Sequence, residues 1–501
     1  MLEVKNLIYL SEQVRALDRT AIEEFNIPGF TLMQRAAQAA FNELKQAWPD
    51  TSNIIVLAGS GNNGGDGYVI AALALAENFK VKVIQFGDHT ALKGDAKKAH
   101  DLYVDKGGLC VAFSVNEFTE CDIIIDALLG TGLKRCVTGD YALAIEAVNN
   151  LTSDLTGRHA VHVLSVDVPS GLDADNGCSL GIAIKAEVTV TFVGMKLGLL
   201  TAAGREYSGR IVFNHLEIPK EVYQSMAATC HSIQLNDLHA MLGKRHTDAH
   251  KGNFGHVLCI GGNLGMAGSV MLAAEAAART GSGLVSVATL SQHAANAVQS
   301  CREIMVHGVD SIKELNPLLA QASVIVIGPG LGQDAWAKSL FSRVLEFDLP
   351  MVVDADALNL LASEPAQKNT WVITPHPGEA ARLLKCSTKE IQQDRLQSVQ
   401  NLQKQYGGVA VLKGSGSLVK GNDEHATSIC TAGNPGMATG GMGDVLTGII
   451  AGLLAQGLNS YDAARFGVQL HAQSADIATQ QGMRGMLASD LFVPLRQLVN
   501  S

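Results

Sequence analysis

Short apolar runs alternate with helical stretches along almost the whole chain, and few folds accommodate this pattern. A short apolar run that ends at a glycine or an aspartate is typical of a strand buried on both faces of a sheet. Strands that alternate with helices pair in parallel and carry helices on both faces. The sequence therefore predicts an α/β protein, with strands at residues 53–58, 81–86, 122–126, 162–168, 188–192, 256–260, 284–288, 323–327, 351–354, 371–374 and 409–413.

The chain is too long for a single hydrophobic core. Its 501 residues exceed the roughly 250–300 residues at which single cores stop growing. In residues 218–228 we expect neither a strong strand nor a core helix, so we place the boundary near residues 220–232. The predicted domains are residues 1–228 and residues 229–501.

Helices are expected at defined places around the strands. Ser11 should cap an amphipathic helix that carries Val14, Leu17, Asp18 and Ile22. The break at Pro28-Gly29 should separate this helix from a second one over residues 32–48. The last long helix should run from residue 444 to about residue 454.

Charge and cysteine pattern narrow the classes of partner. The net charge of -10 at pH 7 provides no basic field for a phosphate backbone, so nucleic acid is not expected as a partner. The nine cysteines contain no C-x-x-C pair, which predicts reduced thiols in a cytoplasmic protein. The sequence has no apolar run long enough for a membrane span and no signal-peptide pattern, so no membrane association is expected.

A glycine-rich loop follows the first expected strand. Gly59, Gly61 and Gly64 match G-x-G-x-x-G, a pattern that lets the backbone approach a pyrophosphate at a helix N-terminus. The same spacing also occurs in a βα turn without a ligand. Asn62, Asn63 and Asp66 favour a binding loop, because amide and carboxylate oxygens are ligands for a hard cation or for ribose hydroxyls. Asp66 could instead cap the following helix.

Two further aspartates stand at the ends of expected strands in the first half. Asp126 precedes a loop with Gly130 and Gly132, and Asp167 precedes a loop with Ser170. Open α/β sheets bind ligands at the carboxyl ends of their strands, so these loops should converge on one crevice. Each aspartate alone could equally be a turn residue.

These segments resemble the signatures of NAD(P)HX epimerase domains, and the resemblance extends through residues 191–200. It implies a Rossmann-like α/β/α sandwich that interconverts the R and S forms of hydrated NADH and NADPH. The implied hydrate-binding residues are Asn62, Asn63, Gly64, Gly65, Asp66, Gly130, Thr131, Gly132, Leu133, Lys134, Arg135, Cys136 and Asp167. A potassium ion would be held by Asn63, Asp126, Asp167 and Ser170, and such oxygen ligands suit a hard cation better than zinc.

The acid-base group of this isomerase reaction is not determined by the sequence. Epimerisation needs proton transfer at the hydroxyl or the ring nitrogen, and Asp126 and Lys196 are candidates. A solvated Lys196 without a catalytic role is the somewhat favoured alternative.

A longer glycine-rich loop, residues 432–444, precedes the last long helix. Its backbone amides can form an anion hole for a transferring phosphoryl group, and Asp444 is placed to take a proton from an attacking hydroxyl. In the alternative interpretation Asp444 is only a partner of the helix dipole. Lys413 and the turn after it, Gly414, Ser415, Gly416 and Ser417, can reach a nucleotide phosphate, or form a plain hairpin turn with an exposed lysine.

The loop around Asp444 and the segment 374–380 resemble the ribokinase-like superfamily. His376 stands where many members have asparagine, and Met442 where many have a small residue, which argues against a plain sugar or vitamin kinase. With residues 251–269 the second half resembles the NAD(P)HX dehydratase branch, which implies a ribokinase-like α/β domain.

In that branch Ala267, Gly330, His376 and Asp444 would contact the S-hydrate. Lys413, Gly414, Ser415, Gly416, Ser417 and Gly443 would bind the nucleotide, with Glu379 associated with magnesium. The combination resembles the bifunctional NAD(P)H-hydrate repair enzymes, which couple an epimerase to a dehydratase (a hydro-lyase). ADP would become AMP and phosphate, or ATP would become ADP and phosphate; the fused architecture favours ADP, and family members are expected to be homo-oligomers.

Two rival functions remain open at this stage. One is a small-molecule kinase whose first domain binds a dinucleotide only for regulation. The other is a dinucleotide sensor without catalysis, against which the presence of Asp444 and Glu379 argues.

Overall fold

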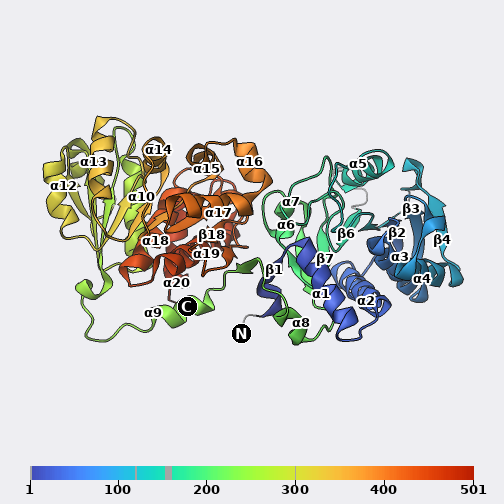
Figure 1. Cartoon of the computed structure of the whole chain (residues 1–501). Coiled ribbons are helices and arrows are strands. Elements are labelled where there is room, and N and C mark those ends of the chain that lie inside the picture. The colour runs from blue at the N-terminus through green and yellow to red at the C-terminus, as the bar shows by residue number, and fades with distance from the viewer. Residues whose placement is uncertain (1–2, 119–120, 153–160, 300, 501) are drawn as a thin grey trace. The chain divides into compact units, whose positions relative to one another are not determined.

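The computed structural model describes residues 3–118, 121–152, 161–299 and 301–500. The chain forms two compact units, residues 1–230 and residues 231–501 (Figure 1). Each unit is built around a largely parallel sheet, so the predicted α/β class is confirmed.

The first unit contains a seven-stranded sheet in which all neighbouring strands run parallel. The expected strands are present within two residues at either end. The edge strands were not expected, because apolar runs as short as 109–112 and 211–213 do not by themselves distinguish a strand from other structure. The order across the sheet is β4 (Leu109–Ala112), β3 (Lys80–Gln85), β2 (Asn53–Ala58), β5 (Ile123–Ala127), β6 (His162–Val166), β7 (Val188–Phe192) and β9 (Arg210–Asn214).

Helices cover both faces of this sheet because successive side chains of each strand point to opposite faces. In β2, Ile54 and Val56 pack into one apolar cluster, and Ile55 and Leu57 pack into another. The first cluster contains buried residues of five helices and the second those of one, so the unit is a three-layer, Rossmann-like sandwich. The five helices are α1 (Ser11–Glu23), α2 (Gly29–Ala47), α3 (Asn62–Ala76), α4 (Gly94–Asp105) and α8 (Lys220–Gln224), and the one is α5 (Asp140–Thr152).

Two local predictions in this unit were wrong. Ser11 does not cap α1: it is the first helical residue, and its hydroxyl donates instead to the Asp175 carboxylate at 2.6 Å. Residues 218–228 contain a short core helix, α8 (Lys220–Gln224), whose Val222 and Tyr223 are buried. The remaining elements of the unit are β1 (Leu7–Tyr9), which pairs in parallel with β8 (Met195–Lys196), and the single-turn helices α6 (Leu197–Leu200) and α7 (Gly204–Tyr207).

In the second unit a parallel sheet ends in an antiparallel hairpin. Strands β13 (Met305–Gly308), β12 (Leu284–Thr289), β11 (His256–Ile260), β14 (Val324–Ile327), β15 (Met351–Val353), β16 (Trp371–Ile373) and β17 (Val409–Leu412) are parallel neighbours in this order. They continue antiparallel through β18 (Leu418–Lys420) and β19 (Thr427–Ile429). The sequence predicted the parallel strands in the middle of the sheet but not β13, β18 or β19, and it indicated a hairpin turn after Lys413 only as an alternative. Strand β10 (Cys230–Ser232) contains the boundary between residues 230 and 231.

One face of this sheet packs against α10 (Ala267–Thr280), α18 (Met442–Ala455), α19 (Ser460–Ala478) and α20 (Phe492–Leu498) in a large apolar cluster. The helices that cover the other face are α12 (Ile312–Leu319), α13 (Ala335–Leu345), α14 (Ala355–Ser363), α15 (Pro377–Leu384), α16 (Thr388–Gln393) and α17 (Arg395–Tyr406); none of their side chains belongs to that cluster. The short helices α9 (Asn236–Leu242) and α11 (Ser291–Ala297) complete the unit. Among the described residues, no helix is long and apolar enough to cross a bilayer.

Candidate functional site

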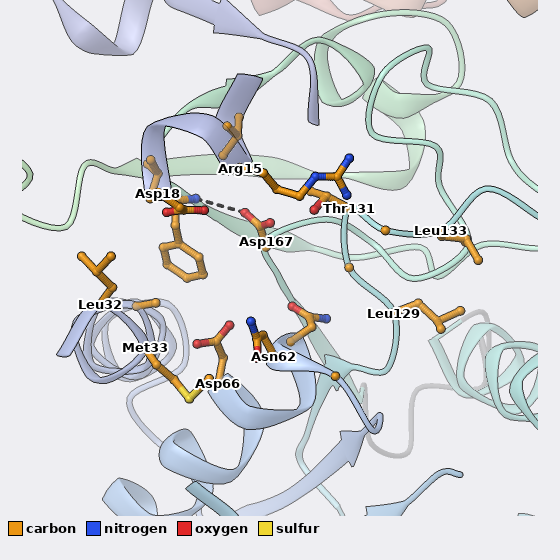
Figure 2. A pocket seen from close by; sticks show the side chains of 18 of the residues that line it. Arg15, Asp18, Leu32, Met33, Asn62, Asp66, Leu129, Thr131, Leu133 and Asp167 are labelled. Carbon is orange, nitrogen blue, oxygen red and sulfur yellow. Dashed lines mark hydrogen bonds between the residues drawn. The ribbon is translucent and has the colours of Figure 1, made fainter. Parts of the chain in front are cut away.

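A cavity of about 890 Å³ opens at the carboxyl ends of the strands in the first unit (Figure 2). Its walls come from α1 and α2, the start of α3, the loop after β5 and the ends of β6 and β8. The predicted loops therefore converge on one crevice.

The first glycine-rich loop turns directly into α3, which begins at Asn62. A Cβ on Gly64 would lie 1.9 Å from the carbonyl oxygen of Gly59, so this turn tolerates no side chain there. Asn62, Asn63 and Asp66 line the cavity, whereas Gly64 and Gly65 are buried behind its wall. Asp66 does not cap α3, because it lies within the helix and faces the cavity.

The loop after β5 forms a second wall. Gly130, Thr131, Gly132, Leu133, Lys134 and Arg135 line the cavity, and Cys136 is exposed outside it. Lys134 is held at this wall by the Asp175 carboxylate at 2.7 Å.

Asp126 and Ser170 form a buried network that does not line this cavity. The Asp126 carboxylate accepts hydrogen bonds from the Ser170 hydroxyl at 2.5 Å, the Ser170 amide at 2.8 Å and the Ser165 hydroxyl at 2.7 Å. Burial raises the pKa of Asp126, and the hydrogen bonds from Ser170 and Ser165 oppose the rise. Nearby, Asn63 packs against Gly130, and its amide nitrogen is buried without a hydrogen-bond partner.

Asp167 and Lys196 form an ion pair on the cavity wall. Asp167 has φ of 65°, a left-handed conformation that aspartate tolerates better than most residues. Lys196 also donates to the Thr191 hydroxyl at 3.1 Å and the Phe192 carbonyl at 2.8 Å. The interpretation of Lys196 as a solvated lysine was wrong, because its side chain is only 1% exposed.

Sequence reasoning missed the contribution of α1. Asp18 and Arg15 both line the cavity (Figure 2). Burial raises the pKa of Asp18 to about 6, the Lys196 ammonium lowers it and the Asp167 carboxylate raises it. The sequence feature that could have indicated this role is the position of Asp18, an acid that lies next to Val14 and Leu17 on the apolar face of an amphipathic helix.

In the second unit, Asp444 stands in the first turn of α18, and the Ser269 side chain of α10 lies near enough to lower its pKa. Burial raises the pKa of Asp444 to about 7, and the charge of Asp354 adds to the rise. Gly330 packs against Met266 and Ser269, where α10 begins with Ala267. The structure thus gathers Ala267, Gly330 and Asp444 around the N-termini of α10 and α18.

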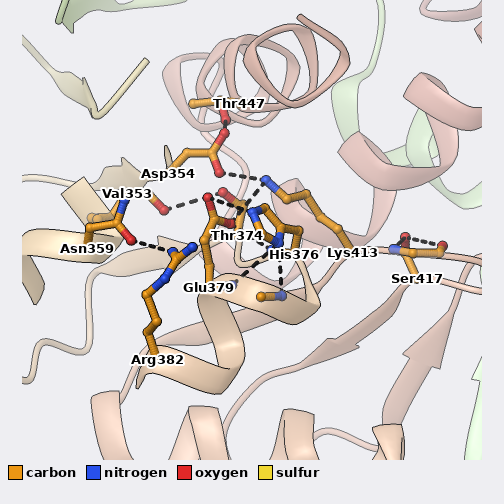
Figure 3. Close-up of polar contacts among 12 residues, drawn as sticks. Val353, Asp354, Asn359, Thr374, His376, Glu379, Arg382, Lys413, Ser417 and Thr447 are labelled. Carbon is orange, nitrogen blue, oxygen red and sulfur yellow. Dashed lines mark hydrogen bonds and ion pairs between the residues drawn. The ribbon is translucent and has the colours of Figure 1, made fainter. Parts of the chain in front are cut away.

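Lys413 points inward from the turn after β17 (Figure 3). Its ammonium lies 2.7 Å from the Asp354 carboxylate and 3.9 Å from that of Glu379. Thr447 of α18 donates to the same Asp354 at 2.8 Å. A Cβ on Gly443 would lie 3.4 Å from the Lys413 ammonium, so the start of α18 adjoins this ion pair. The alternative of an exposed lysine was wrong, although the turn does join an antiparallel hairpin.

His376 and Glu379 form a capping box at the start of α15 (Figure 3). The Glu379 carboxylate accepts from the His376 amide at 2.8 Å, and His376 Nδ1 accepts from the Gly378 amide at 2.9 Å. Burial and the Lys413 charge lower the pKa of His376, which favours a neutral ring that still exposes half of its surface. Burial raises the pKa of Glu379 to about 7.

The turn after Lys413 is supported by Arg395, a residue that sequence reasoning missed. Its guanidinium is 2% exposed and donates to the carbonyls of Leu412, Lys413 and Gly416 at 3.3–3.4 Å. Gly414 and Ser415 are exposed, whereas Gly416 is buried, and Ser417 donates from its hydroxyl back to the Gly414 carbonyl. In the sequence, Arg395 is only a single arginine in a helix that precedes a strand. This feature is too common to identify a residue that supports the nucleotide turn.

Both units match known families. Residues 257–496 match the family described as NAD(P)H-hydrate dehydratase, and residues 29–198 match the YjeF-related protein N-terminus. In its second unit the chain is similar to a ribokinase-like superfamily protein from Enterococcus faecalis V583, with 31% identity, a TM-score of 0.50, and coverage of 54% of this chain and 95% of that one. The ribokinase-like fold is thereby confirmed.

Similarity to curated proteins extends over both units. The chain is 46% identical to the bifunctional NAD(P)H-hydrate repair enzyme Nnr of Coxiella burnetii over 99% of both chains. It is 41% identical to the enzyme of the same name from Escherichia coli strain K12, over 99% of this chain and 95% of that one. The resemblance predicted from the motifs is confirmed. The chain belongs to the family of bifunctional NAD(P)H-hydrate repair enzymes.

Proposed function

We propose that this protein repairs hydrated NADH and NADPH by two reactions. Residues 1–228 interconvert the R- and S-hydrates, and residues 229–501 dehydrate the S-hydrate to NADH or NADPH at the expense of ADP or ATP. The observation that carries the proposal is the presence of both family matches in one chain, each on its own compact unit.

In the dehydratase reaction, Asp444 takes the proton of the hydrate hydroxyl as the oxygen attacks the terminal phosphorus of the nucleotide. The ring nitrogen then supplies an electron pair, phosphate leaves, and loss of the neighbouring C–H proton restores the double bond. A carboxyl whose pKa is raised to about 7 suits a general base near neutral pH. Ala267, Gly330 and His376 would contact the hydrate, because they surround Asp444 or adjoin the Lys413 ion pair.

Lys413, the turn Gly414–Ser417 and Gly443 would hold the nucleotide phosphates. Mg²⁺ is usually bound by one or two carboxylates together with substrate phosphates and water. Glu379 fits this role through Oε1, because the His376 amide occupies Oε2. Bound Mg²⁺ would neutralise charge on the phosphates, and we propose ADP as the natural nucleotide from the fused architecture.

In the first unit the donor set fits a potassium ion. Ser170 and Asp126 supply oxygen atoms, and a half-turn of the Asn63 amide would place its oxygen where the nitrogen now lacks a partner. The Asp167 carboxylate would contribute only Oδ2, since Oδ1 is taken by Lys196, Thr191 and Phe192. The ion would order the loop of residues 130–136, which we propose as the wall against which the hydrate lies.

The test incubates the full chain with mixed R- and S-hydrates of NADH, potassium, magnesium and either ADP or ATP. Recovery of reduced-nicotinamide absorbance from both epimers, with equal phosphate release, supports both reactions, and the faster nucleotide identifies the co-substrate. Replacing potassium by choline should slow only epimerisation. A stable phosphorylated product without recovered absorbance would instead support the small-molecule kinase. A homo-oligomer in the cytoplasm stays a prediction, which light scattering and cell fractionation test.

A further inference from the structure

The cavity of the first unit is lined by four carboxyl groups, those of Asp18, Asp66, Asp95 and Asp167, and by four cationic side chains, those of Arg15, Lys134, Arg135 and Lys196. Asp18 of α1, Asp66 of α3 and Asp167 after β6 all turn into it (Figure 2), and Lys196 lies at its wall. These groups come from separate elements, so only the folded unit brings them together.

Neither of the two candidates named from the sequence, Asp126 and Lys196, is placed to transfer protons to the hydrate. Asp126 has no exposed surface and is absent from the cavity lining. Lys196 has three N–H donors, and they have three acceptors: the Asp167 carboxylate, the Thr191 hydroxyl and the Phe192 carbonyl. The ammonium is therefore a fixed positive charge that orients Asp167.

Asp18 and Asp66 differ from these two groups. Both line the cavity, and neither carboxylate has a hydrogen-bond partner within the described residues 3–118, 121–152, 161–299 and 301–500. Their oxygens are therefore free to bond to a ligand. Met33 and Leu32 of α2 add an apolar wall beside them, which restricts water around the carboxyls.

Both ammonium groups that line the cavity already have carboxylate partners: Lys196 pairs with Asp167, and Lys134 pairs with Asp175. A second and a third negative charge in the same cavity would therefore repel each other and Asp167. Burial and the charges of Asp167 and Asp18 raise the pKa of Asp66 well above its usual range, whereas the pKa of Asp18 rises only to about 6. Arg15 is the other charged group of α1 at this cavity. Repulsion between the carboxylates therefore disfavours ionisation of Asp18 and Asp66 at the same time.

We propose that Asp18 and Asp66 are the acid-base pair that epimerises the hydrate, with Lys196 and Asp167 as positioning residues. The proposal rests on the epimerase function proposed above. Addition of water to the enamine double bond of a dihydronicotinamide places a hydroxyl on the carbon bonded to the ring nitrogen, which makes the hydrate a hemiaminal. Such a carbon inverts by opening and closing the ring.

In this step the Asp18 carboxylate takes the hydroxyl proton, the O–H electron pair forms the C=O bond, and the C–N bond breaks. Its electron pair stays on nitrogen, which receives the proton of Asp66. Rotation about the adjacent C–C bond presents the other face of the aldehyde. The nitrogen then attacks that face, Asp66 recovers its proton, and Asp18 returns the other to oxygen, so no co-reactant is consumed.

The experiment compares the full-length variants Asp18→Asn and Asp66→Asn with the wild type, using purified R-hydrate of NADH. Each should lower kcat for R-to-S conversion by at least about 100-fold, the usual lower limit for loss of a general acid or base. The KM for the hydrate and the dehydration of S-hydrate should change by less than about 3-fold, since the hydrogen-bonding shape is kept. The wild-type rate of epimerisation should fall at acid pH, and this fall should disappear in Asp18→Asn.

The matched control is Asp101→Asn, an acid-to-amide change on the surface of α4, where Asp101 pairs with Lys97 at 3.0 Å. Circular dichroism of each variant checks folding, and because the carboxyls lie on different helices, one variant tests the proposal if the other fails to fold. Epimerisation within about 3-fold of wild type in both folded variants overturns the proposal. Full exchange of the hydroxyl oxygen with ¹⁸O-labelled water at each inversion, which indicates loss of hydroxide instead of ring opening, also overturns it. Absence of epimerisation in the wild type would refute the proposed function itself.

Discussion

Lys196, which is buried, and Lys413, which is partly buried, show how the surroundings of one residue type determine its role. Lys413 pairs with Asp354 next to Glu379 and the start of α18, so its charge acts on the groups that would receive a nucleotide. Lys196 has three acceptors within the chain and acts only on Asp167 and its neighbours. Both lysines lie on strands or directly after strands. Their different burial and hydrogen-bond partners leave the Lys413 ammonium able to act on a nucleotide, whereas the Lys196 ammonium is fixed.

The raised pKa of Asp444 predicts the pH dependence of dehydration. A general base works in its ionised form, so kcat/KM should rise with pH up to about 7 and fall about tenfold per unit below it. Asp444→Asn should lower dehydration by about 10²–10⁴-fold while epimerisation persists. Initial rates between pH 5.5 and 8.5 give the profile.

Glu379 has a similar pKa of about 7 and is coupled to the same Lys413 and Asp354 charges. Glu379→Gln is therefore the control. If the fall in dehydration rate at acid pH is due to protonation of Asp444, this variant should still show it. The assignment to Asp444 would be contradicted by two results together. The rate of Glu379→Gln would no longer fall at acid pH, and the residual rate of Asp444→Asn would still fall.

Arg395 gives a second prediction for a single side chain. Arg395→Gln removes hydrogen bonds from the carbonyls of Leu412, Lys413 and Gly416, so the nucleotide turn should loosen. We expect the free energy of unfolding of the second unit to fall by about 2–3 kcal/mol and the KM for nucleotide to rise about tenfold. Urea denaturation and initial rates measure both. Arg279→Gln, on the surface of α10 beside Glu275, should change stability by less than about 0.5 kcal/mol; an equal loss there would refute the special role of Arg395.

At the scale of the element, the close packing of α10 against α18 positions the dehydratase groups. Gly448 permits this approach: a Cβ there would lie 2.0 Å from the Ala273 carbonyl oxygen. The same helices carry Ser269 and Asp444, and the Ser269 side chain lowers the pKa of Asp444. A change in helix separation therefore acts directly on the proposed base.

Gly448→Ala should force the two helices apart. We expect a loss of about 1–3 kcal/mol in the free energy of unfolding from overpacking, together with a fall in dehydration kcat. Gly268→Ala, on α10, is the matched control because no atom lies within 4 Å of the added Cβ. That change should leave stability equal or raise it by up to about 1 kcal/mol, since alanine favours a helix over glycine. Denaturation curves of both variants measure the change in stability. Equal changes in the two variants would show that the close contact at Gly448 does not determine stability.

At the scale of the whole molecule, the proposed reactions use separate groups in separate compact units. The first needs the cavity around Asp66, and the second needs Asp444. If the S-hydrate leaves one unit and diffuses to the other, the two units need not belong to the same chain.

A mixing experiment tests this separation. Asp66→Asn should dehydrate S-hydrate but leave R-hydrate, and Asp444→Asn should interconvert the epimers without dehydrating them. An equimolar mixture should convert R-hydrate completely to NADH, as followed by absorbance at increasing enzyme concentration. Failure of the mixture, with each variant retaining its own half-reaction, would show that both sites must act within one chain.

Much of this molecule follows from the sequence alone. The central strands, the loops of residues 59–67 and 432–444, and the family were predictable because apolar runs and backbone turns depend on neighbouring residues. Edge strands β4, β9 and β13 were not predictable, because their apolar runs are too short to distinguish a strand from other structure. The roles of Asp18, Asp354 and Arg395 were decided only by the tertiary structure, because their burial and charge partners come from distant elements. Electrostatic interactions in a cavity depend on distance in space, which a one-dimensional pattern does not contain.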